Sequence, residues 1–117
     1  MATARQQPRA RGGAVAEALL RRVFATVRVP IRFRLWDGTT VNVGGRDCAF
    51  AVVFGSPAVF RRVLRRPTPL RFGEAYIGGD LDIEGDILGA MRAAAEIEHL
   101  RVPVRTRVAV LAGLLRV

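Results

Sequence analysis

A run of alternating residues that leads into a tight-turn signal constrains the fold of this chain more than any other feature. From Val27 to Leu35 every second residue is apolar, and arginine fills three of the positions between. A period of two is typical of a strand with one buried face, and Pro30 indicates an edge position or a bulge. Asp37 and Gly38 then predict a hairpin turn. The returning strand is expected at residues 39–43.

The remaining sequence predicts a third strand and four helices around this hairpin. Residues 48–54 are apolar enough for a buried strand. Ser56 and Pro57 supply a cap and a first-turn proline for a helix, and Asp86 can cap another. Apolar spacing and helix breakers place the helices at residues 14–26, 57–66, 87–100 and 104–117. The expected fold class is therefore α+β, with a small antiparallel sheet packed against helices.

Length and composition indicate one domain. With 117 residues, half of them apolar, the chain can bury a single modest core. Residues 1–13 contain three arginines and no acidic residue, which predicts a flexible basic tail, and residues 14–117 are expected to form the domain. No apolar stretch reaches the length needed to cross a bilayer.

The segment from Pro69 to Asp86 is chemically set apart from the rest of the chain. It holds half of the ten acidic residues, namely Glu74, Asp80, Asp82, Glu84 and Asp86. Four glycines divide it, which predicts tight turns around short elements. Leu81 and Ile83 alternate with the acidic residues, as in a short strand with one dry face. We expect these acidic side chains to meet arginines of this chain or of a partner.

Asp80 to Gly85 also matches the opening of a calcium-binding loop of the helix-loop-helix type. Such a loop requires a bidentate glutamate at its twelfth position, and that position holds Met91 here. The alternation favours the strand, so no metal site is predicted. Cys48 is the single cysteine, which excludes an internal disulfide, and a buried apolar role is expected for it.

Nineteen arginines and no lysine stand against ten acidic residues, which gives a net charge of +9. Guanidinium groups pair well with phosphate and carboxylate, so this charge indicates an anionic partner such as phospholipid headgroups or nucleic acid. The predicted helix at residues 57–66 has one apolar side, which suits a surface helix that closes the core or a helix that lies on an anionic membrane. The two interpretations are compatible, because arginines that face solvent remain available to a phosphate. Headgroup contacts are expected from the other side of this helix, which carries Arg61, Arg62, Arg65 and Arg66.

Side chains suited to catalysis are few. His99 is the only histidine and Ser56 the only serine, and Ser56 is needed as a helix cap. No glycine-rich loop follows a predicted strand and opens a long helix in the way that a nucleotide or dinucleotide site requires. We therefore predict no catalytic residue and no cofactor for this chain on its own.

The acidic segment and its surroundings resemble the N-terminal domain of cyclopropane-fatty-acyl-phospholipid synthases. The signature residues are Gly73, Glu74, Ala75, Tyr76, Gly79, Asp80, Asp82, Gly85 and Asp86. The upstream order of strands, turn and arginine-rich helix is similar as well, and the resemblance covers about Val29 to Leu100.

This resemblance implies a small α+β unit of sterol-carrier-like shape that helps to engage lipid and to assemble a dimer. In that family, a separate Rossmann-like domain uses S-adenosylmethionine to modify unsaturated acyl chains of membrane phospholipids. Since the family's linker and catalytic domain would begin near Val117, where this sequence ends, we expect either a free-standing accessory domain or a part of a longer enzyme.

The expected function is thus a non-catalytic one, lipid engagement or docking within a phospholipid-modifying methyltransferase system. The expected partners are an anionic phospholipid or membrane surface, a methyltransferase domain in cis or in trans, and a second copy in a homodimer. The expected location is cytoplasmic, peripheral to the inner face of the membrane. The apolar lining of a lipid site is predicted from Phe33, Leu35, Phe50, Val52, Phe54 and Phe60. A nucleic-acid-binding module, supported by charge alone, and a purely structural dimerisation domain are the alternatives.

Overall fold

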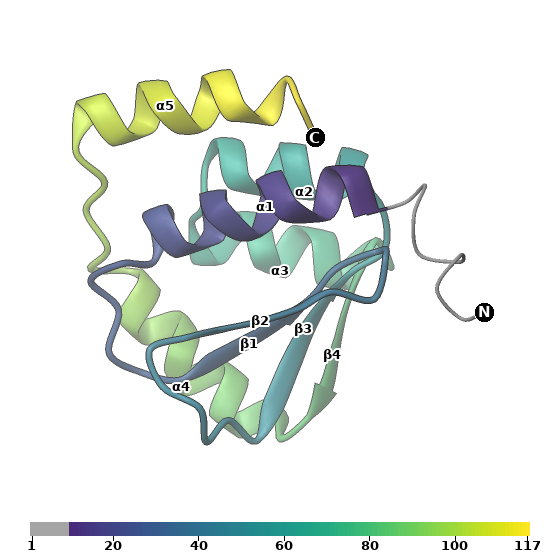
Figure 1. Cartoon of the computed structure of the whole chain (residues 1–117). Coiled ribbons are helices and arrows are strands. Elements are labelled where there is room, and N and C mark those ends of the chain that lie inside the picture. Colours follow the sequence, from purple (N-terminus) through teal and green to yellow (C-terminus); the bar gives the residue numbers. More distant parts are fainter. Residues whose placement is uncertain (1–9) are drawn as a thin grey trace.

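The computed structural model describes residues 10–117, which form a four-stranded sheet covered by helices (Figure 1). In chain order the elements are α1 (Ala10–Val23), β1 (Ile31–Arg34), β2 (Thr40–Val43), β3 (Phe50–Phe54), α2 (Pro57–Arg65), α3 (Pro69–Ile77), β4 (Leu81–Gly85), α4 (Ile87–Ile97) and α5 (Val104–Leu114). The predicted α+β fold class is confirmed.

The strands lie in the order β2-β1-β3-β4. β1 and β2 form the predicted hairpin, and β3 and β4 are also antiparallel. β1 and β3 are parallel, however, so the sheet is mixed and not purely antiparallel as expected. The cause is the connection at residues 44–49. This connection starts at the end of β2, which lies beside Ile31 at the start of β1. It crosses the start of β1, so β3 begins near the start of β1 but on its other side.

Alternation along the strands puts the core on one face of the sheet. Ile31, Phe33 and Leu35 are buried beneath the helices, while Arg32 and Arg34 between them remain partly exposed. On this outer face Arg34 forms an ion pair with Glu84 of β4. α5 packs on α1 and α2 and lies farthest from the sheet (Figure 1). The order of layers is therefore sheet, helices and one outermost helix.

Two boundaries near the start of the chain, that of the tail and that of the first strand, differ between the prediction and the structure. Residues 1–9, which make up most of the predicted tail, lie outside the described part of the chain. The last four residues of that tail, 10–13, belong to the first turn of α1. The first strand starts at Ile31 and not at Val27, since Pro30 has no N–H group to donate to a neighbouring strand.

The largest departure from the sequence prediction is α3, which replaces the tight turns expected after Pro69. Thr68 caps this helix, because its hydroxyl accepts a hydrogen bond from the Arg71 N–H at 3.2 Å. Pro69 follows at the first helical position, where a missing N–H costs nothing. Gly73 lies in the middle of the helix, and the turns begin only at Gly78.

The predicted acidic strand is confirmed as β4. Leu81 is buried and Ile83 partly buried, while Asp82 and Glu84 are exposed. The strand ends at Gly85, which has φ 92°. A Cβ atom there would collide with the backbone oxygen of Ala49, so only glycine fits.

Candidate functional site

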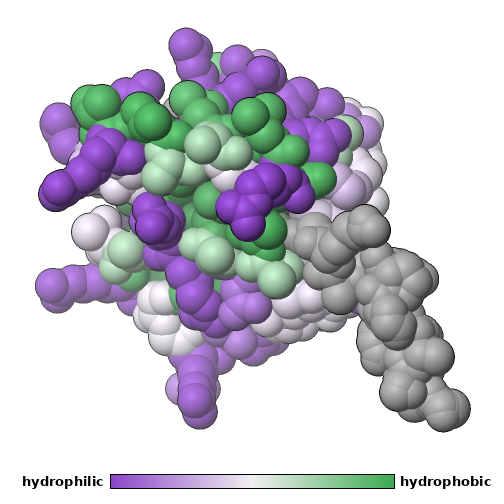
Figure 2. Space-filling view, turned by 45° about the horizontal axis from the view of Figure 1, so that its top comes forward, coloured by the Kyte–Doolittle hydropathy of each residue, from purple (hydrophilic) through white to green (hydrophobic). Residues whose placement is uncertain are grey.

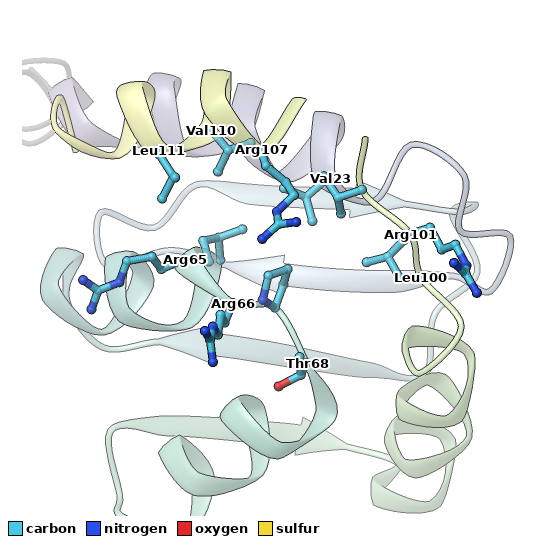
Figure 3. A pocket seen from close by; sticks show the side chains of 12 residues that line it. Val23, Arg65, Arg66, Thr68, Leu100, Arg101, Arg107, Val110 and Leu111 are labelled. Atoms are coloured by element: carbon cyan, nitrogen blue, oxygen red, sulfur yellow. The ribbon is translucent and has the colours of Figure 1, made fainter. Parts of the chain in front are cut away.

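A groove lined by arginine lies beneath α5. It has a volume of about 650 Å³ and runs between α5, the α2–α3 connection and the α4–α5 connection. We call it the arginine groove, because its lining includes Arg65, Arg66, Arg101 and Arg107. Figure 3 shows Arg107 pointing from α5 into this space, with the Arg65 and Arg101 side chains towards its two ends. Three separate segments of the chain therefore supply its charge.

A second hollow continues the arginine groove outward. Its volume is about 380 Å³, and it shares Arg65, Arg66 and Arg107 with the groove while adding Arg62 and Arg71. Within residues 10–117, the side chains of Arg65, Arg66, Arg71, Arg101 and Arg107 form no ion pair with a described acidic residue. Concentrated cationic charge of this kind attracts anions, and the guanidinium fork matches phosphate and carboxylate.

The structure divides the four arginines predicted from α2 into two pairs. Arg61 donates a hydrogen bond to the backbone oxygen of Val117 at 3.1 Å, and Arg62 forms an ion pair with Asp80 at 2.8 Å. Arg65 and Arg66 line the arginine groove, a position compatible with the headgroup contacts predicted for them. Arg71, Arg101 and Arg107 also line these hollows but are not predicted from the sequence, because no local signal shows how their segments pack near α2.

An apolar stripe follows the solvent side of α5, close to the groove. It consists of Val104, Val108, Leu111 and Leu115, of which Leu115 is 88% exposed. Their spacing of four, three and four residues places them along one side of a helix. Figure 2 brings the top of the molecule forward and shows apolar side chains gathered there, with strongly polar side chains around them. Leu111 also lines the arginine groove, so the two surfaces adjoin.

A separate apolar cavity of about 280 Å³ lies between the sheet, α3 and α4. Its floor is formed by side chains of three strands, Ile31, Phe33, Phe50, Val52, Leu81 and Ile83. α3 contributes Phe72, Gly73 and Tyr76, and the small residues Ala90 and Ala94 of α4 leave space on the other side. No charged residue lines the cavity.

Half of the predicted apolar lining is found in this cavity. Phe33, Phe50 and Val52 line it. Leu35, Phe54 and Phe60 do not, because they are packed in the core. The Phe54 and Phe60 rings meet edge to face, with centroids 5.1 Å apart, where α2 covers the sheet.

The residues that line the cavity and those that line the arginine groove are close in the sequence at the start of α3 and again after α4. Thr68 lines the groove and the next residue, Pro69, lines the cavity. Ile97 lines the cavity and Leu100, three residues later, lines the groove. A charged compartment therefore lies close to an apolar one.

The signature residues build the α3–β4–α4 unit around the cavity. Tyr76 lies at its rim, and at Gly73 no atom beyond the neighbouring residues and backbone of α3 lies within 4 Å of the position that a Cβ would take. Ala75 is buried, and Gly79 adopts φ 83° in the turn before β4. The remaining polar members are Glu74 and Asp82, which are exposed, Asp80, which pairs with Arg62, and Asp86, which caps α4 by accepting a hydrogen bond from the Leu88 N–H at 3.1 Å.

Two further observations concern chemistry and membranes. Among the described residues, no three His, Cys, Asp or Glu side chains are grouped so that they could hold a metal ion. None of the helices at residues 10–117 is long and apolar enough to cross a bilayer.

Comparison with known proteins places the chain in a family. The model of a domain of unknown function, DUF7884, matches residues 15–100. The chain belongs to this family. The DUF7884 chain is also similar to a probable fatty acid methyltransferase of Pseudomonas putida, with 28% identity over 74 residues. The match covers 63% of this chain but only 18% of the relative's length. The similarity is therefore to a small part of a methyltransferase.

Proposed function

We propose that this DUF7884 domain is a non-catalytic lipid-engaging domain of a fatty-acid or phospholipid methyltransferase system. In this proposal it binds the headgroups of anionic phospholipids, and a methyltransferase domain in cis or in trans carries out the reaction. The similarity to part of a fatty acid methyltransferase supports the connection with that class of enzyme. The resemblance of the Gly73 to Asp86 segment to cyclopropane-fatty-acyl-phospholipid synthases supports it further.

The observation that carries the proposal is the convergence of arginines on one groove beside exposed apolar side chains. Arg65, Arg66 and Arg107 face a common space and have no described acidic partner. Val108 and Leu115 of the apolar stripe are exposed nearby. Cationic and apolar side chains on one surface are the combination with which proteins bind the interface of an anionic membrane.

Sedimentation with vesicles tests this proposal. The intact chain should sediment with phosphatidylglycerol vesicles and much less with phosphatidylcholine vesicles. Each arginine near an anionic surface contributes about 1 kcal/mol. The combined change Arg65→Gln, Arg66→Gln and Arg107→Gln should therefore weaken binding about a hundredfold.

A matched variant controls for the loss of three charges. Arg28, Arg46 and Arg92 are exposed and lie outside the groove, so their change to Gln should have a much smaller effect on vesicle binding. Equal weakening in both triple variants would contradict a role for the groove. Displacement of the vesicles by duplex DNA, without the reverse, would favour the nucleic-acid alternative.

A further inference from the structure

The apolar cavity opens to solvent between α3 and α4. Tyr76, Ile87 and Met91 line it and are 40%, 41% and 65% exposed. Leu88, outside the lining, is exposed beside them. Apolar surface around an opening is unfavourable to hydrate. Contiguous exposed apolar patches are typical of sites that bind a ligand, a membrane or another protein.

The lining restricts what can enter. Only the Tyr76 hydroxyl offers a polar side-chain group, and no charged residue faces the space. A ligand segment with polar atoms would lose its hydration there without replacement hydrogen bonds. The part of a ligand that fits is therefore a hydrocarbon.

The position of the cavity indicates where the polar end of such a ligand would lie. Pro69 and Ile97 line the cavity at the start of α3 and the end of α4, away from the Tyr76, Ile87 and Met91 opening. Thr68 and Leu100 of the arginine groove are close to them in the sequence. An amphiphile with its phosphate on the arginines would therefore insert its alkyl chain at the Pro69 and Ile97 end of the cavity.

We infer that the apolar cavity binds one acyl chain of the lipid whose headgroup lies on the arginine groove. The inference rests on the proposed function for the headgroup. It adds that one acyl chain of the lipid leaves the bilayer to enter the protein. The domain would then hold a single lipid tail, and not only a membrane surface, for the methyltransferase system.

Gly73 allows the inference to be tested. It lines the cavity from the middle of α3, and apart from α3 itself nothing lies within 4 Å of the position that its Cβ would take. Gly73→Leu should fill the cavity without disturbing the helix, because leucine is a better helix former than glycine. Ala94→Leu fills the cavity from α4. Ala95→Leu, on the exposed side of α4, is the control.

The probes are dodecyl phosphate below its micelle concentration and inorganic phosphate. The wild type should bind dodecyl phosphate at least about tenfold more tightly than inorganic phosphate, since a buried chain adds apolar contact. The NMR signals of the Met91 and Ile97 methyl groups should shift only with the alkyl probe. Gly73→Leu and Ala94→Leu should lose this gain, and Ala95→Leu should keep it.

Two readouts separate the inference from the proposed function. If dodecyl phosphate binds no better than inorganic phosphate, or if both cavity-filling variants keep the gain, the acyl-chain inference is wrong, whatever the vesicles do. If the chain does not sediment with anionic vesicles but the cavity signals still shift with dodecyl phosphate, the headgroup proposal is wrong and the cavity inference stands. If Gly73→Leu still binds vesicles but no longer binds dodecyl phosphate more tightly than inorganic phosphate, the proposed function and the acyl-chain inference are both supported.

Discussion

At the residue scale, two neighbours on β4 meet opposite surroundings. Leu81 is 3% exposed and faces the core, whereas Asp82 is exposed to solvent. We expect Leu81→Asp to lower the free energy of unfolding by about 3 kcal/mol or more, because it places an unpaired charge in the core. Asp82→Asn should change it by no more than about 0.5 kcal/mol. Urea unfolding measures both variants, and equal effects would contradict the orientation of β4.

At the scale of the element, the start of α3 depends on one hydroxyl group. Thr68→Ala removes the hydrogen bond to Arg71 N and should lower the free energy of unfolding by about 1 kcal/mol. Amide hydrogen exchange should quicken first in α3. Thr68→Ser keeps the cap and is expected to retain the exchange rates of the wild type. Faster exchange in both variants would show that the cap does not hold this helix.

How far the elements can be predicted depends on whether their signals are local. Ser56 and Pro57 predict the start of α2, and Thr68 and Pro69 carry the same signal for α3. α3 nevertheless escapes prediction, because Pro69 also suits the end of α2 and Gly73 lowers helix propensity. The alternation in β4 is fully local, so its inward and outward faces are predictable.

The groove and the mixed sheet have no such local signal. Arg107 follows Arg65 by more than forty residues, and the two line the same groove only because α5 packs on α1 and α2. The parallel pairing of β1 and β3 depends on which side of β1 the connection at residues 44–49 passes. Amphipathic patterns report which face of an element is buried, but not which partner covers it.

At the scale of the whole molecule, the described fold lacks the unit that would hold a nucleotide-like cofactor. β3 passes to α2 through Gly55 and Ser56 alone, without a glycine-rich loop. We therefore expect calorimetric titration of the chain with S-adenosylmethionine to show no saturable binding. Inorganic phosphate serves as the control for attraction to the arginines. A dissociation constant in the micromolar range would contradict the non-catalytic proposal.

The outward acidic side chains of β4 also bear on how the protein behaves when it is concentrated. β4 is an edge strand, and unpaired edges recruit strands of other molecules into aggregates. If two copies joined their β4 edges antiparallel about Ile83, Asp82 of each would stand opposite Glu84 of the other, and the like charges would repel. The acidic side chains of β4 thus disfavour the pairing of two copies through this edge of the sheet.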